Sequence, residues 1–279
     1  DEEGGTVVRV SSNPNLRETP FLSPKDTYAD GGWDAVKQDA EEKADLLFSL
    51  GINVNLAPVC DMTSDEYGFM YDRSFSSDVD MENRYVRTVV ETSKSKKLGT
   101  VLKHFPGYGN NSDTHTGIAY DDRDYSEFEN TDFKPFYQGI ESGADCILVS
   151  HNIVNCMDSE YPASLSQKVH DILRNEFKFD GVIMTDDLIM DAITDFTGDE
   201  AAAVTAAKCG NDLLCCSSVN TQYPAVLEAV QNGEIPEAQV DASVKRILKW
   251  KQNLGIFSID TYQKKVKSTE PTDTVGSEE

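Results

Sequence analysis

Polar side chains follow three separate apolar runs of this sequence. The runs, with the polar residues that follow them, are 100–102 with Lys103 and His104, 146–150 with His151, and 182–185 with Asp186 and Asp187. If the runs are parallel strands, these side chains meet at one end of a sheet, where a carboxylate beside imidazole and ammonium groups can act in nucleophilic or acid–base catalysis. Each residue also has an ordinary explanation. Asp186 would cap a helix, and Lys103 and His104 would make a structural ion pair and a buried, hydrogen-bonded histidine.

A second candidate pair lies in the loop that follows His104. Asp113 stands two residues before His115, in a segment rich in Gly and Asn. An Asp at this spacing can accept a hydrogen bond from the imidazole, which fixes the tautomer and raises its basicity. The alternative is an Asx turn without a chemical role. The fourth histidine, His170, lies on a predicted helix, where we expect it to pack or to face solvent.

The elements that position these residues alternate between short apolar runs and longer helical patterns. We predict strands at 54–59, 100–104, 145–150, 181–185 and 212–216, with a further one at 6–10. We predict helices at 33–50, 81–97, 133–142, 167–177 and 200–209, and a final amphipathic helix at 241–254. This alternation favours an α/β fold with a parallel sheet, and its repeat favours a TIM-type (β/α) barrel over an open sheet.

A closed barrel of this kind has eight strands, and the sequence shows fewer. Either early elements lie upstream of Asp1 or short strands escape the pattern. We expect one barrel domain over 1–258, a polar tail over 259–279 and no second domain. The chain begins without an initiator Met or a signal peptide, so any targeting segment would lie upstream and the compartment stays open.

The amino-acid composition restricts the classes of partner that the protein can bind. Its 279 residues include 49 Asp and Glu against 25 Lys and Arg, a formal net charge of −24. Such a charge repels nucleic acid and anionic membranes, although it also simply favours solubility. No apolar run has the roughly 18 residues of a membrane span. The six cysteines lack the spacing of a zinc site, and we expect buried free thiols.

Several segments together resemble glycoside hydrolase family 3, in its β-N-acetylhexosaminidase branch of single-domain type. Lys103-His-Phe-Pro-Gly-Tyr-Gly, followed by Asp113-Thr-His115, is similar to the signature of that branch, and residues 181–190 resemble the family's nucleophile segment. Three further segments agree in order: Asp1-Glu-Glu-Gly-Gly, Asn55-Leu-Ala-Pro-Val-Cys-Asp61 and Asp72-Arg-Ser-Phe75. The resemblance covers about Asp1 to Phe257.

The resemblance implies a (β/α) barrel that lacks its first strand in this chain. It also implies catalytic roles: Asp186 as nucleophile, His115 as acid/base and Asp113 as the partner of His115. The residues implied to hold the sugar in the first subsite are Asp1, Arg9, Arg73, Lys103 and His104, with His151 lining the same site and Asp187 supporting it. The chain departs from the family pattern at Tyr108, where His is common, at Thr6, where Arg is frequent, and in a loop 109–115 that is one residue shorter.

The implied activity is retaining hydrolysis of non-reducing terminal β-linked N-acetylglucosamine, from oligosaccharides or the peptidoglycan fragments of bacterial cell-wall recycling, with no metal or organic cofactor. Three alternatives stay open. One is a β-glucosidase or a glycoside phosphorylase of the same family, and another is a non-catalytic sugar-binding relative. The third is a metal-dependent hydrolase built on His104, His115, His151 and Asp186. The aglycone and the oligomeric state are not fixed by the sequence.

Overall fold

The computed structural model describes residues 1–111, 113–114, 117–197 and 199–262. Its centre is a four-stranded parallel sheet in the order β3 (Val54–Asn55), β4 (Gly99–Phe105), β6 (Cys146–Val149) and β8 (Val182–Thr185). Isolated parallel bridges extend the pairing at Val59 with Lys103 and at Met184 with Leu213. Because consecutive strands pair in parallel, their carboxyl ends meet at one edge of the sheet, as the sequence predicted.

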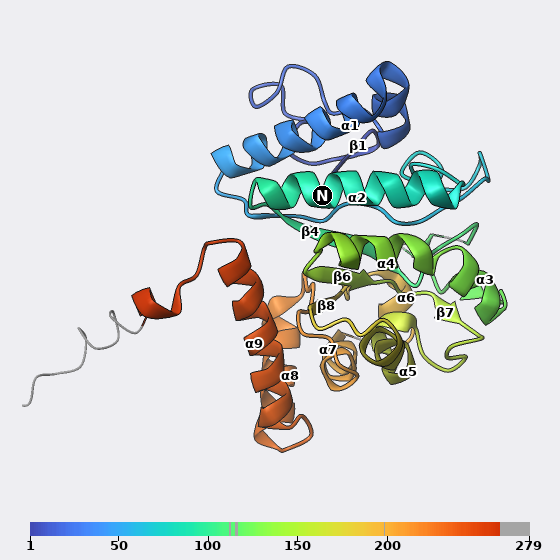
Figure 1. Ribbon diagram of the computed structural model, residues 1–279. Coiled ribbons are helices and arrows are strands. Elements are labelled where there is room, and N and C mark those ends of the chain that lie inside the picture. The colour runs from blue at the N-terminus through green and yellow to red at the C-terminus, as the bar shows by residue number, and fades with distance from the viewer. Residues whose placement is uncertain (112, 115–116, 198, 263–279) are drawn as a thin grey trace, which may run out of the picture.

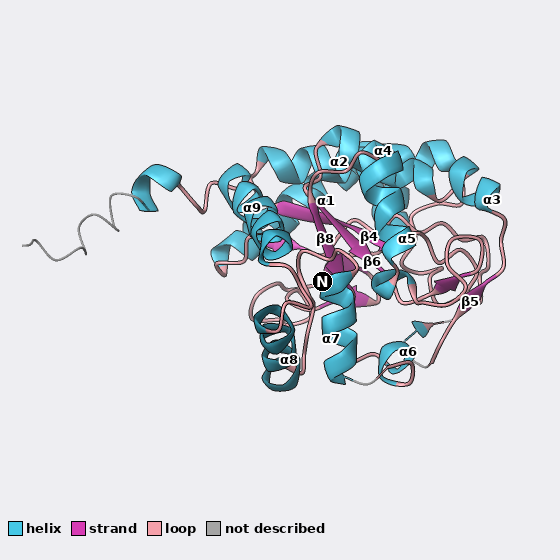
Figure 2. Ribbon diagram, turned by 90° about the horizontal axis from the view of Figure 1, so that it is seen from below, coloured by secondary structure: helices cyan, strands magenta, loops and turns pink. Residues whose placement is uncertain are grey.

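One face of the sheet is covered by a layer of helices. These are α1 (Pro24–Ser49), α2 (Val79–Ser95), α4 (Phe133–Ser142), and α5 (Gln167–Asp171) with the π-helical turn η3 (Ile172–Glu176). Figures 1 and 2 show α1, α2 and α4 side by side over the strands. Aromatic rings fill the space between, where Phe105 stacks on Phe133 and meets Phe136 and Phe177 edge-on. This apolar layer holds β4 and the residues that follow it in place.

The helix boundaries follow from local sequence. Ser23 caps α1 by accepting from the Asp26 N–H, and Asp78 caps α2 by accepting from the Met81 N–H. Gly143, with φ of 96°, ends α4 in the left-handed conformation that glycine adopts without strain.

The other face of the sheet packs against the last helix, α9 (Glu237–Asn253). Trp250 of α9 is buried with Val101, Cys146 and Val182 of the strands. Before α9, α7 (Asp199–Lys208) and α8 (Val219–Gln231) pack against each other. The remaining elements are short: a hairpin of β1 (Glu2–Gly4) and β2 (Val7–Val8), the parallel pair β5 (Tyr120–Asp121) and β7 (Ile153–Val154), and the helices α3 (Tyr125–Asn130), η2 (Ala163–Leu165) and α6 (Asp191–Thr194).

The predicted α/β class and the parallel sheet are confirmed. Among the described residues the sheet does not close into a barrel, with β3 at one edge and Leu213 at the other. Residues 6–10 were expected to form a strand of the barrel, but only Val7–Val8 are extended, and they belong to the antiparallel hairpin. The strand predicted at 54–59 is interrupted because Pro58 has no N–H to donate.

The start of one predicted helix was wrong, and one helix was not predicted. Helix α1 begins nine residues before the predicted start at Trp33, because its two parts join across a kink at Gly31 and Gly32, whose backbone angles are not helical. The sequence analysis missed α8, whose first half contains Pro224. No helix within the described ranges is long and apolar enough to cross a membrane. Residues 263–279 of the predicted tail lie outside those ranges.

Candidate active site

Asp186 stands directly after β8, at the carboxyl edge of the sheet. Its N–H donates to the Val149 carbonyl of β6 at 3.0 Å, so the parallel pairing continues one residue beyond the strand. The Asp187 N–H donates to Asp186 Oδ1 at 2.9 Å. The carboxylate is therefore held on its backbone side, and no described residue donates a hydrogen bond to Oδ2. This leaves one oxygen available to an electrophile.

The charges around Asp186 favour its ionised form. Burial alone would raise the pKa of this carboxyl, but the electrostatic influence of His151, His104 and Lys103, together with the Asp187 N–H, outweighs it and lowers the pKa. Asp186 is therefore a carboxylate at neutral pH.

Lys103, at the end of β4, lies in an ion-pair network with the β1 hairpin. Its Nζ lies 2.6 Å from Asp1 Oδ1 and 2.6 Å from Glu3 Oε1. Glu3 also accepts from Arg73, at 2.9 Å from Nε and 2.8 Å from a terminal nitrogen. Burial alone would raise the pKa of Glu3, but Lys103 and Arg73 hold it well below its usual range. Burial lowers the pKa of Lys103, against the opposing effect of Glu3.

His104 connects this network, through Arg73, to Asp61. Its Nδ1 lies 2.7 Å from Asp61 Oδ2, and the same oxygen accepts from the His104 backbone N–H. An Arg73 terminal nitrogen lies 3.1 Å from Nε2. Because arginine can only donate, Nε2 accepts and Nδ1 carries the proton towards Asp61. The imidazole orientation is therefore fixed from both sides.

Tyr108 links Asp61 to Thr114 in the loop that follows Tyr108. Its N–H donates to Asp61 Oδ1 at 2.7 Å, and its hydroxyl lies 2.5 Å from Thr114 Oγ1. Thr114 is the residue between Asp113 and His115 in the sequence, and this contact holds Thr114 beside Tyr108. Asp113 is half-buried there. His115 lies outside the described residues, and the Asp113–His115 pair stays a prediction.

The start of that loop is anchored by Arg123. Its guanidinium contacts Asp121 at 2.8 Å, Asp132 at 2.9 Å and the Gly107 carbonyl at 3.2 Å. Gly107 has φ of 125°, and a Cβ there would lie 2.3 Å from Asp132 Oδ1. Only glycine allows the chain to turn at this point.

His151 follows β6 and is completely buried. Its Nδ1 lies 2.7 Å from Ser164 Oγ, and its Nε2 lies 3.0 Å from the Asp187 carbonyl. Since a carbonyl only accepts, Nε2 is the donor, and Ser164 donates to Nδ1 when the ring is neutral. The His151 imidazole therefore fixes the position of the Asp187 backbone, next to Asp186. Its expected place in the sugar subsite stays a prediction.

Asp187 contacts Ser217, and the supporting role implied for Asp187 stays a prediction. Its carboxylate accepts from the Ser217 N–H at 3.2 Å and from the Ser217 hydroxyl. By contrast, Arg9 is exposed after β2, and its side chain makes no hydrogen bond with the described residues. The structure thus brings Asp1, Arg73, Lys103 and His104 into one network beside Asp186, while Arg9 stands outside it.

Sequence reasoning did not assign a role to several residues that build this site: Glu3, Asp61, Thr114, Ser164 and Ser217. Glu3 and Asp61 are the ones with a signal, because each is a carboxylate in a segment that carries the family resemblance. Among the described residues no group of three or more His, Cys, Asp or Glu is arranged to hold a metal ion.

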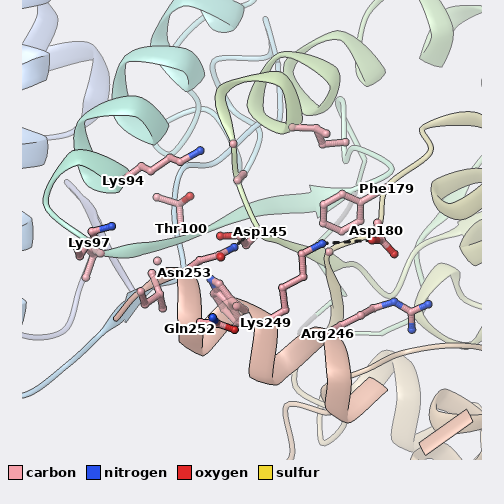
Figure 3. A pocket seen from close by; sticks show the side chains of 18 residues that line it. Lys94, Lys97, Thr100, Asp145, Phe179, Asp180, Arg246, Lys249, Gln252 and Asn253 are labelled. Atoms are coloured by element: carbon pink, nitrogen blue, oxygen red, sulfur yellow. Dashed lines mark hydrogen bonds and ion pairs between the residues drawn. The ribbon is translucent and has the colours of Figure 1, made fainter. Parts of the chain in front are cut away.

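A crevice of about 670 Å³ lies at the opposite, amino ends of the strands. Figure 3 shows Lys249 reaching Asp180 and Asn253 reaching Asp145 there, from α9 to the turns before β8 and β6. Lys94 and Lys97 line another side of it. None of the predicted catalytic residues lines this crevice, so it is separate from the candidate active site.

The sequence profile of the glycosyl hydrolase family 3 N-terminal domain matches residues 1–250. The chain belongs to glycosyl hydrolase family 3. This membership confirms the resemblance found in the sequence and the expected enzyme class, a glycoside hydrolase. A β-hexosaminidase of Hydrogenovibrio crunogenus is 32% identical over 86% of this family 3 chain and 69% of its own length. One of Nitrosomonas eutropha is 31% identical over 78% of this chain and 64% of its own.

Solved structures of similar proteins agree with this fold. A β-N-acetylglucosaminidase from a Paenibacillus species has a TM-score of 0.85 and 29% identity, over 92% of this chain and 49% of its own. A β-N-acetylhexosaminidase from Beutenbergia cavernae has a TM-score of 0.81 and 26% identity, over 90% of this chain and 77% of its own. The present chain thus spans between about half and three quarters of these proteins.

Proposed function

We propose that the chain carries the active site of a retaining β-N-acetylhexosaminidase that removes terminal β-linked N-acetylglucosamine. The observation that carries the proposal is the position of Asp186, whose Oδ1 accepts from the Asp187 N–H and whose Oδ2 is unbonded within the described residues, beside Lys103, His104 and His151, which lower its pKa. The hexosaminidase names of the similar proteins support the choice of sugar. Residues 1–258 would form the catalytic domain.

The reaction has two steps. Asp186 Oδ2 attacks the anomeric carbon while His115 protonates the glycosidic oxygen, so the glycosidic bond breaks and a glycosyl ester forms. His115 then takes a proton from water, which attacks the same carbon and releases Asp186 as a carboxylate. A histidine suits both steps because its pKa lies near neutral pH. Asp113 would hold its ring and stabilise the protonated form.

The ion-pair network would hold the sugar in the first subsite. Lys103 has three N–H donors, and Asp1 and Glu3 accept from two of them, which leaves the third for a sugar hydroxyl. Asp1 is half-exposed and offers a carboxylate oxygen as acceptor. Arg73 would add a further directional contact, with His104 holding its guanidinium through Nε2, and Arg9 would reach in from the hairpin. Such charge-assisted hydrogen bonds fix the orientation of the sugar.

A panel of nitrophenyl β-glycosides of N-acetylglucosamine, N-acetylgalactosamine, glucose and xylose tests the proposal, assayed with and without phosphate. We expect the highest kcat/KM for N-acetylglucosamine, no dependence on phosphate, and the β-anomer of the free sugar as first product by NMR. Preference for glucose would indicate a β-glucosidase, and a sugar phosphate product would indicate a phosphorylase. Absence of turnover on every glycoside would favour a sugar-binding relative, and loss of turnover with a chelator would favour the metal-dependent hydrolase.

A further inference from the structure

Two adjacent cysteines lie beside the segment that carries Asp186. Cys215 and Cys216 follow Leu213, the residue bridged to β8, and both are half-buried. Three of the other cysteines, Cys60, Cys146 and Cys209, are buried, and the exposed one, Cys156, stands alone. The chain therefore offers one pair of adjacent, half-buried thiols.

Hydrogen bonds tie this pair to the nucleophile segment on both sides. The Cys215 N–H donates to Thr185 Oγ1 at 3.0 Å, and the Cys215 carbonyl accepts from the Leu188 N–H at 3.1 Å. On the far side of Cys216, Ser217 donates to the Asp187 carboxylate from both its N–H and its hydroxyl. Cys215 and Cys216 thus belong to the segment whose hydrogen bonds position residues 185–188.

Asp187 connects the 215–217 segment to Asp186, the proposed nucleophile. Its N–H donates to Asp186 Oδ1, and its carbonyl accepts from His151 Nε2. A change in the backbone at 215–217 would shift Ser217, then Asp187, and then Asp186. A displacement of about 1 Å at a reacting group is enough to lower a rate by about 10²-fold.

We propose that Cys215 and Cys216 form a modification site for trivalent arsenicals, and that its occupation displaces the nucleophile segment and stops turnover. The second half of this inference rests on the proposed function. With an arsine oxide, both thiols add to arsenic. Two As–S bonds form, the As=O bond breaks, and the oxygen leaves as water with the two thiol protons. No electrons are transferred, so no oxidant is needed.

The geometry favours a bridging ligand over a direct disulfide. Adjacent Cα atoms are about 3.8 Å apart, below the separation of about 4.4–6.8 Å that disulfides adopt without strain. A bridging arsenic atom enlarges the ring and relieves that strain. Burial and the nearby Asp187 and Asp186 raise the pKa of Cys215 to about 11, so this thiol is protonated at neutral pH.

Phenylarsine oxide tests the inference on the full chain. We expect one equivalent to bind in the intact mass, with the loss of two alkylatable thiols that map to the peptide holding Cys215 and Cys216. Turnover of the nitrophenyl glycoside should fall by about 10²-fold or more. A dithiol such as dimercaptopropanol should restore it, whereas an equal concentration of a monothiol should not. The Cys216→Ser variant should keep its own rate in the presence of the reagent, and Cys156→Ser, the matched control, should be inhibited like the wild type.

The mass measurement does not depend on the glycosidase proposal. No stable adduct, or an adduct retained by Cys216→Ser, would refute the site. Hydrogen exchange of residues 185–190 decides the coupling even if no glycoside is turned over: faster exchange in the adduct of the wild type is expected, and unchanged exchange contradicts it.

Discussion

The two ends of the same four strands use charge in opposite ways. At the amino ends, three carboxylates meet side-chain partners: Asp212 binds Arg174 at 2.6 Å and Arg246 at 2.9 Å, Asp180 pairs with Lys249, and Asp145 accepts a hydrogen bond from Asn253. At the carboxyl ends, Asp186 lies beside the basic side chains of Lys103, His104 and His151 but accepts a hydrogen bond from the described residues at only one oxygen.

The difference separates stability from reactivity. Asp212 also accepts from the Ile183 N–H and from Ser243, so its bonding capacity is filled and it fastens α9 to the sheet. Asp186 is kept ionised while one oxygen stays available. Substitutions at the carboxyl end should therefore change rates, and substitutions at the amino end should change the free energy of unfolding.

The largest effect is expected for Asp186→Asn. An amide cannot attack the anomeric carbon, so turnover should fall by about 10⁴-fold or more, while the unfolding temperature changes little. Activity on nitrophenyl N-acetylglucosaminide and thermal unfolding measure the two. Asp187→Asn is the neighbouring control and should retain more activity. If Asp186→Asn keeps a substantial part of the wild-type rate on an activated substrate, then Asp187 or another carboxylate is the nucleophile.

His115→Ala should come next, with a loss that depends on the leaving group. Natural disaccharides need a proton on the departing alcohol, and their cleavage should slow by about 10²- to 10⁴-fold. The dinitrophenolate of a dinitrophenyl glycoside leaves without protonation, so the rate at which the enzyme is glycosylated should be much less affected. Deglycosylation still needs a base, so a burst should appear in stopped-flow records, and azide should raise the steady-state rate. Equal slowing of both substrates without a burst would make His115 a binding residue.

Asp113→Asn should show a milder form of the same behaviour. A neutral partner stabilises the imidazolium less, so the basic limb of the pH–rate profile should move to lower pH. An unchanged basic limb would separate Asp113 from the acid/base group.

At the amino end, Asp212→Ala should cost stability instead of rate. The change leaves Arg174 and Arg246 without their carboxylate and removes the acceptor of the Ile183 N–H, which should lower the free energy of unfolding by about 3–5 kcal/mol. Urea denaturation measures the loss, and activity per folded molecule should stay at the wild-type value. Asp212→Asn serves where the alanine variant does not fold. A fall in kcat of the folded fraction would contradict the division between the two ends.

The smallest effect is expected for Lys249→Ala. Lys249 and Asp180 are 64% and 80% exposed and lie 3.4 Å apart, so their pair should contribute less than about 1 kcal/mol. The difference from wild type should shrink further in high salt, and kcat should not change. A stability loss as large as that of Asp212→Ala would show that this ion pair, and not Asp212, fastens α9.

Local patterns in the sequence predicted much of the fold. Helix α4 was predicted with its observed bounds, because its apolar spacing is regular and Gly143 ends it. Strands β4 and β8 were predicted within one residue at each end. Helix α8 was missed because Pro224 disfavours a helix locally, and the π-helical turn at 172–176 has no sequence signal distinct from an α-helix.

The candidate site was predictable only in part. Lys103, His104, His151 and Asp186 follow apolar strands, so their convergence could be inferred from topology alone. Glu3 could not be assigned in the same way, since its role comes from contacts with Arg73 and Lys103, which stand 70 and 100 residues away. Tyr108 stands where the family commonly has histidine, and this difference in the sequence did not indicate that the Tyr108 hydroxyl contacts Thr114.

The most direct test of the account is to trap the glycosyl-enzyme. A fluorinated N-acetylglucosamine derivative with an activated leaving group should form the ester and hydrolyse slowly, because the fluorine destabilises the positively charged transition state of both steps. Peptide mapping of the inactivated protein should then find the sugar on the peptide that contains Asp186, with fragmentation placing it on that residue, and Asp186→Asn should take up no label. Labelling of Asp187 or of another carboxylate, or hydrolysis of the substrate with inversion and no trapped ester, would contradict the central claim.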